Sequence, residues 1–187
     1  MIYPQKIKAK ESDKIIKILL IVSVILAIVL FVINKLTVPN IPWAALANAG
    51  IIYIWIVVLY SIKRNINIAG HVLLQTIALS VLTVFIDYEL GFKGWAIDIA
   101  IPIIIIVANA TMLILTIVSY KKYLKYAFCQ LMIVLFSMLP LVLVNKNIVH
   151  NKILSIIASC ISILNFIITL SLTVKDLKQA IIRKFHM

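Results

Sequence analysis

Acidic residues, glycines and cysteines are scarce in this sequence, and each shortage excludes a class of functional site. The 187 residues include six acidic side chains, four glycines and two cysteines. Cysteine and histidine are never clustered at the spacing of metal ligands. The sequence also has no glycine-rich phosphate-binding loop, nucleophile elbow or zinc-protease helix. We therefore expect no catalytic residue, no metal site and no cofactor, and we predict that the protein is not an enzyme.

The two cysteines, Cys129 and Cys160, both lie inside long apolar runs. The expected threading places Cys129 near the inner end of its helix and Cys160 in the outer half of another. Their Cα atoms would then be too far apart for a disulfide bond.

Charged residues are missing from the centre of every long apolar run. Charges inside a membrane usually mark proton relays and ion pathways. Their absence argues against a proton- or sodium-driven pump built on charged ligands. A carrier of a neutral or lipid-like substrate stays open.

Apolar residues make up 64% of the chain, and the mean hydropathy is +1.16. A soluble domain of this size cannot bury so much apolar surface. The apolar runs have the length of membrane spans. The sequence therefore predicts an all-α membrane protein, a bundle of six transmembrane helices over residues 15–34, 42–60, 68–86, 96–120, 126–144 and 153–174.

Basic residues indicate how the chain is threaded. If both termini are inside, the inner segments hold fourteen of the eighteen Lys and Arg residues. That split follows the positive-inside rule and predicts a multi-pass protein of the cell membrane with cytoplasmic termini. Because the basic residues lie in short loops and tails, the net charge of +12 does not indicate a nucleic-acid partner.

We divide the chain into a basic tail (1–14), a six-helix transmembrane domain (15–174) and a second basic tail (175–187). Ser12 or Asp13 can cap the first helix. Apolar residues at helical spacing make the second tail an amphipathic helix, either on the inner leaflet or as the solvated end of the last helix.

The connection at residues 87–98 is the one acidic, glycine-containing loop, and it is expected outside. Its candidate binding residues are Asp87, Glu89, Trp95 and Asp98, which could hold a cation or a basic substrate. We prefer a structural interpretation. Asp87 would end one helix in water, and Asp98 would lie in the first turn of the next helix, where a negative charge suits the helix dipole.

Uncharged polar residues form stripes on the predicted spans. One face of the third span carries Thr76, Ser80, Thr83 and Asp87. One face of the sixth span carries Ser155, Ser159, Ser162, Thr169 and Thr173. Gln75 and Asn165 lie beside these two faces, and three further amides lie in other spans: Asn48, Asn109 and Gln130. We prefer helix packing through these residues, and a polar cavity lined by the five amides is the alternative.

The second and fourth spans share a pattern. Residues 41–42 and 101–102 are both Ile-Pro, and residues 47–49 and 108–110 are both Ala-Asn-Ala. A parallel repeat of helical hairpins would explain this. Chance similarity in so apolar a sequence is the preferred explanation.

The stretch with Asp87, Gly91-Phe92-Lys93-Gly94-Trp95 and Pro102, preceded by Tyr53-x-Trp55, resembles an uncharacterised family of six-helix membrane proteins (a domain of unknown function) from low-GC Gram-positive bacteria. The resemblance covers roughly residues 40 to 145. Family members often carry an N-terminal zinc ribbon. No cysteine precedes Cys129, so a metal-sensing role does not follow here.

These observations favour a non-enzymatic accessory or scaffold subunit. Its expected partners are membrane lipids, another membrane protein, or a second copy in a homo-oligomer. A small transporter for a neutral or amphiphilic solute is the alternative. An intramembrane enzyme is a third and weaker hypothesis, since the spans show no catalytic group.

Overall fold

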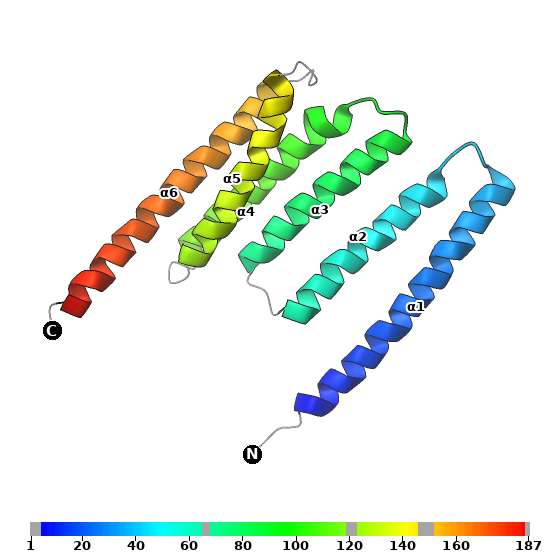
Figure 1. The fold of residues 1–187 in the computed structure, drawn as a ribbon, viewed down its shortest axis with the longest axis horizontal. Coiled ribbons are helices and arrows are strands. Elements are labelled where there is room, and N and C mark those ends of the chain that lie inside the picture. Colours follow the sequence, from blue (N-terminus) through cyan, green and yellow to red (C-terminus); the bar gives the residue numbers. More distant parts are fainter. Residues whose placement is uncertain (1–4, 65–67, 119–122, 146–151, 186–187) are drawn as a thin grey trace. The chain divides into compact units, whose positions relative to one another are not determined.

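The computed structural model describes residues 5–64, 68–118, 123–145 and 152–185, and these residues are almost entirely helical (Figure 1). The helices are α1 (Gln5–Thr37), α2 (Trp43–Arg64), α3 (Ile68–Glu89), the short π-helix η1 (Ala96–Ala100), α4 (Ile101–Val118), α5 (Tyr123–Asn145) and α6 (Lys152–Phe185).

Six helices in the described part of the chain are long and apolar enough to cross a membrane. Their apolar segments are Lys14–Thr37, Trp43–Ser61, Ile68–Glu89, Ala96–Val118, Ala127–Asn145 and Lys152–Leu172. The predicted set of six apolar helices is confirmed, and it indicates a membrane protein.

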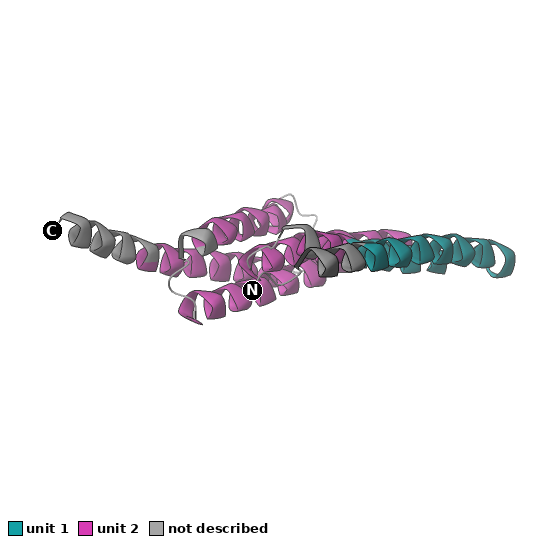
Figure 2. Cartoon of the chain, turned by 90° about the horizontal axis from the view of Figure 1, so that it is seen from below, with its two compact units in different colours: residues 1–55 teal, residues 56–187 magenta. Residues whose placement is uncertain are grey.

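The chain divides into two compact units, residues 1–55 and 56–187 (Figure 2). In the first unit, α1 and the start of α2 form a hairpin. Asn34 closes its turn, since its Oδ1 accepts the Ala44 N–H at 2.9 Å and its amide donates to the Val38 carbonyl at 3.1 Å. Farther along the hairpin, the Trp55 indole N–H donates to Ser23 Oγ at 2.7 Å.

In the second unit, α4 packs against α3, α5 and α6. A small apolar core joins three of these helices through Ala69, Ala108, Met112 and Ile133. The buried set also includes many polar side chains, whereas large aliphatic side chains are widely exposed. This distribution is the one a bilayer favours, since lipid can cover apolar side chains while polar groups find partners inside the protein.

The first helix starts earlier than predicted. It begins at Gln5, so Ser12 and Asp13 lie within α1 and the predicted cap is wrong. Gln, Lys, Ala and Glu are good helix formers and extend the helix through the polar tail. At the other terminus, α6 runs without a break to Phe185, so the second basic tail continues the last helix.

The fourth span is not one regular α-helix from Ala96. A π-helical turn precedes it, with the Ile101 N–H bonded to the Ala96 carbonyl. Pro102 gives the physical reason, because its ring would clash with the carbonyl four residues earlier in a regular α-helix. Pro140 is also inside a helix, and α5 continues past it to Asn145.

Candidate functional site: a polar seam and an apolar groove

Three of the five predicted amide residues meet inside the second unit. Gln130 Nε2 of α5 donates to Asn109 Oδ1 of α4 at 2.6 Å. Asn165 Nδ2 of α6 donates to the Asn109 backbone carbonyl at 2.8 Å. We call this cluster, together with Ser162, the polar seam. Its four side chains are all buried, so their bonds form away from solvent.

Asn109 is the centre of the seam. Its amide donates to Ser162 Oγ on α6 at 2.7 Å and to the Ile105 carbonyl, one turn back in its own helix, at 2.9 Å. Both N–H groups are therefore used. The Ser162 hydroxyl donates in turn to the Ala158 carbonyl. One side chain thus joins three helices through direct hydrogen bonds.

The seam continues along α6 toward the end of α5. Ser159 Oγ approaches the Ser137 carbonyl of α5 at 2.9 Å and the Ser155 carbonyl of its own helix at 3.0 Å. The predicted polar face of the sixth span points inward over Ser155, Ser159, Ser162 and Thr169. The side chain of Thr173 lies outside the described residues. The inward, buried position of this face is confirmed, and all of its described hydroxyls form hydrogen bonds except that of Ser155, which has no partner within the described residues.

Two oxygens in the seam have no partner. Gln130 Oε1 and Asn165 Oδ1 are buried and accept no hydrogen bond. An unpaired buried acceptor is destabilising. Each of these two oxygens could therefore accept a hydrogen bond from a small ligand with an N–H or O–H group. Neutral amides cannot act as acid or base, so the seam has binding chemistry only.

The other two amide residues lie elsewhere. Asn48 belongs to the first unit, where its amide donates to the Ala27 carbonyl of α1 at 3.3 Å and its Oδ1 is buried without a partner. Gln75 is exposed on α3. Within the second unit, the seam therefore holds three of the predicted amides, and Gln75 is not among them.

The acidic loop is organised around Asp87, which is fully buried. Its Oδ1 accepts the Lys93 N–H at 3.1 Å, and its Oδ2 accepts the Gly94 N–H at 2.9 Å. Its carbonyl accepts the Phe92 N–H at 2.8 Å. The expectation that Asp87 ends its helix in water is wrong, because backbone N–H groups of the loop replace water around the carboxylate.

Backbone conformation explains the glycines of this loop. Gly91 and Gly94 have φ values of 96° and 82°, and Phe92 between them has a φ of 50°. Only glycine takes such values without strain. Asp87 therefore stabilises a turn that presents the exposed Phe92 ring.

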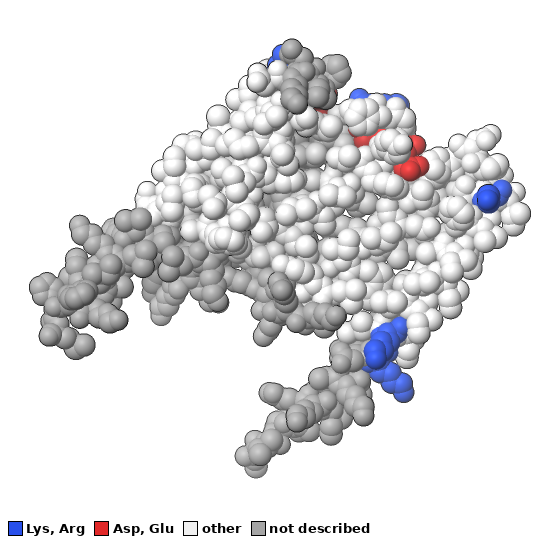
Figure 3. All heavy atoms as spheres, in the orientation of Figure 1, with Lys and Arg blue, Asp and Glu red and all other residues white. Residues whose placement is uncertain are grey.

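The other predicted loop residues do not share the burial of Asp87. Glu89, Trp95 and Asp98 are half-buried. Asp98 lies in the first turn of η1, as predicted. Figure 3 shows acidic atoms gathered at this end of α3. Among the described residues, no three His, Cys, Asp or Glu side chains are grouped closely enough to hold a metal ion.

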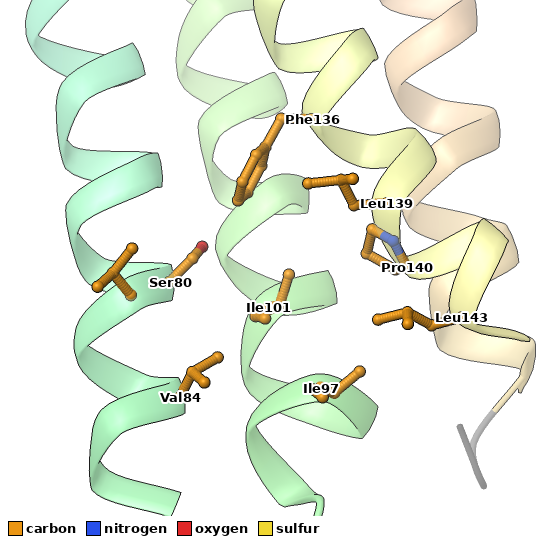
Figure 4. Close-up of a pocket in the computed structure, with 9 residues that line it drawn as sticks. Ser80, Val84, Ile97, Ile101, Phe136, Leu139, Pro140 and Leu143 are labelled. Carbon is orange, nitrogen blue, oxygen red and sulfur yellow. The ribbon is translucent and has the colours of Figure 1, made fainter. Parts of the chain in front are cut away.

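An apolar groove lies beside this end of the bundle, and sequence reasoning missed it. Its volume is about 290 Å³. Side chains of α3, of η1 and the start of α4, and of α5 converge on it (Figure 4). They are Ser80, Val81, Val84, Ile97, Ile101, Phe136, Leu139, Pro140 and Leu143. The hydroxyl of Ser80 is already bonded to the Thr76 carbonyl, so the groove offers apolar contact.

The π-helical turn and the proline inside α5 both border this groove. Ile97 belongs to the π-helical turn before Pro102, and Pro140 lines the α5 side. Proline has no N–H to donate to the carbonyl four residues earlier, so the helix lacks one backbone hydrogen bond there. The two prolines were the sequence signal for an irregular surface here.

Comparison with known proteins gives one match. The sequence pattern of a family of unknown function (DUF6320) covers residues 3–187. No curated protein and no solved structure matches the chain. The expectation of an uncharacterised family is thus confirmed, and the match extends beyond residues 40 to 145 to nearly the whole chain. The chain belongs to the family of unknown function DUF6320.

Proposed function

We propose that this protein is a non-enzymatic accessory or scaffold subunit of the cell membrane that binds a lipid acyl chain in the apolar groove. Both termini are cytoplasmic in this proposal, as the positive-inside rule favours. The acidic loop then faces outward, and the groove opens in the outer half of the bilayer. Reporter fusions at each terminus test this orientation.

The observation that carries the proposal is the groove itself. It lies beside the Asp87 loop, between helices that are long and apolar enough to cross a membrane, and its lining is apolar. Its volume of about 290 Å³ is at the lower end for ligand sites, which suits one slender chain better than a bulky solute. A lipid chain is the abundant molecule of that shape in a bilayer.

Selectivity would depend on the headgroup. Moving a chain from bulk lipid into an apolar groove gains van der Waals contact but no hydrophobic free energy, since both surroundings are apolar. The loop beside the groove, at the end of α3 (Figure 1), exposes Lys93. The exposed Lys93 favours a lipid with an anionic phosphate.

Lipid retention by groove variants tests this proposal. Val84 lines the groove, whereas Val142 is exposed on α5 outside it. Val84→Trp fills the groove and Val142→Trp is the matched control. Native mass spectrometry of purified protein counts the phospholipids retained. The proposal expects Val84→Trp to lose a lipid that both wild type and Val142→Trp keep, and equal retention by all three would refute it.

One observation favours the alternative, a small transporter for a neutral solute. Gln130 Oε1 and Asn165 Oδ1 are buried acceptors without a donor. A passing solute with N–H or O–H groups could supply those donors. Since the remaining polar groups of the seam bond one another, we rank this function second.

A further inference from the structure

Gln75 has an environment that a single chain leaves incomplete. Its side chain is exposed on α3. Within the described residues, no hydrogen bond reaches its amide, although the neighbouring Thr76 hydroxyl is bonded to the Val72 carbonyl. A glutamine amide can form four hydrogen bonds, so this side chain has its whole capacity unused.

The depth of Gln75 makes this exposure significant. It lies seven residues after Ile68, the first residue of α3, which is about 10 Å along the helix axis. The hydrocarbon core of a bilayer is about 30 Å thick. With the membrane span beginning at Ile68, Gln75 would lie nearer the midplane than the interface, too deep for its short side chain to reach water. Lipid tails offer no hydrogen bond, so a protein partner is needed.

The surroundings of Gln75 form a second groove, of about 270 Å³, between α3 and α4. Its lining includes Val72, Leu79 and the small residue Ala108. The lining hydroxyls of Thr76 and Thr111 are both bonded to carbonyls of their own helices. Among these three polar side chains of the lining, Gln75 is therefore the one whose hydrogen-bonding groups are unused.

We propose that two copies of this chain associate through the α3–α4 face, with the two Gln75 amides hydrogen-bonded to each other across a two-fold axis. An amide is both donor and acceptor, so it complements itself. A two-fold interface also places the same residue opposite itself. The dimer gives the proposed scaffold subunit a partner, a second copy of itself. It rests on the proposed function only in this choice of partner and not on lipid binding in the other groove.

Cysteine cross-linking in membranes tests the dimer. Cys129 and Cys160 are replaced first, and Val72→Cys is introduced in the groove, one turn before Gln75. Phe128→Cys is the control, because Phe128 is exposed on α5 at the same end of the bundle. We expect cross-linked dimer from Val72→Cys and little from Phe128→Cys.

The same background with Gln75→Leu isolates the amide. Leucine is close to glutamine in volume but has no amide, so this substitution should weaken dimer association about tenfold. Gln75→Asn keeps an amide and should retain part of the association. A chain that is monomeric with Gln75 present, or that dimerises equally well as Gln75→Leu, overturns the inference. Lipid counts on the same samples keep the two proposals separate, since the groove at Val84 is lined by other residues.

Discussion

Gln130 Nε2 and Asn109 Oδ1 are 2.6 Å apart, and this contact joins α5 to α4 inside the bundle. Asn165 reaches the same residue from α6. In a membrane the hydrophobic effect does not drive helices together. Interhelical hydrogen bonds and close packing must therefore hold the bundle together. The seam therefore serves mainly to hold the helices together. The candidate binding surfaces are the two grooves and the outer loop.

Disrupting the seam should reveal energetic coupling between Asn109 and Gln130. We expect a double-mutant cycle with Asn109→Leu and Gln130→Leu to give about 0.6 to 2 kcal/mol of coupling, as for other interhelical bonds in membranes. Unfolding in mixed detergent measures it. Gln130→Leu combined with Thr83→Val is the control, because Thr83 bonds the Ser80 carbonyl of its own helix. Additive effects in both pairs would contradict the contact.

Asp87→Asn should destabilise the outer loop. One side-chain oxygen remains to accept the two N–H groups that the carboxylate now accepts, and the charge that strengthens both bonds is lost. We expect a loss of about 1–3 kcal/mol, together with faster proteolysis of the loop. Glu89→Gln removes a half-buried charge nearby and should change little. Equal effects of the two substitutions would assign the loss to charge alone.

Glycine substitutions should separate the loop from the helices. Gly94 has a φ of 82°, so Gly94→Ala should lower the unfolding free energy by about 1–2 kcal/mol. Gly50 lies within α2, with no heavy atom within 4 Å of an added Cβ. Gly50→Ala should therefore be neutral or stabilising, by up to about 1 kcal/mol. Thermal unfolding in detergent measures both, and the opposite order would be inconsistent with the loop geometry.

Trp55→Phe should loosen the hairpin of the first unit. It removes the indole N–H that bonds Ser23 Oγ at 2.7 Å and keeps an aromatic ring. The expected loss is about 0.6 kcal/mol, near the average for such bonds in membranes. Combining it with Ser23→Ala should add little further, because the partner is already gone. A fully additive double variant would show that the bond is not formed.

Much of the fold could be predicted from sequence because apolar run length reports directly on membrane helices. The inward face of the sixth span was also predictable, since Ser155, Ser159 and Ser162 repeat at helical spacing. The proposed hairpin repeat stays a prediction. Continued into the third and fifth spans, it would pair Gln75 with Gln130, and these two differ in surroundings, since Gln130 is buried in the seam and Gln75 is exposed.

Contacts between distant residues could not be predicted in the same way. Gln130 and Asn165 are 21 and 56 residues from Asn109, and helix periodicity does not say which amides will meet. Asp87 was misplaced because a carboxylate is exposed by default. Its partners are backbone N–H groups six and seven residues later, available only in the turn that Gly91 and Gly94 allow.

Thiol accessibility of Ser162→Cys tests the central claim that the polar seam is closed to water. Ser162 is fully buried, and cysteine is close to serine in size. In a background without native cysteines, a membrane-impermeant thiol reagent is applied from each side, with exposed Lys93→Cys as the reactive control. The account predicts that Ser162→Cys reacts from neither side while Lys93→Cys reacts. Labelling of Ser162→Cys from both sides would show an aqueous path through the bundle and would replace the scaffold with a transporter.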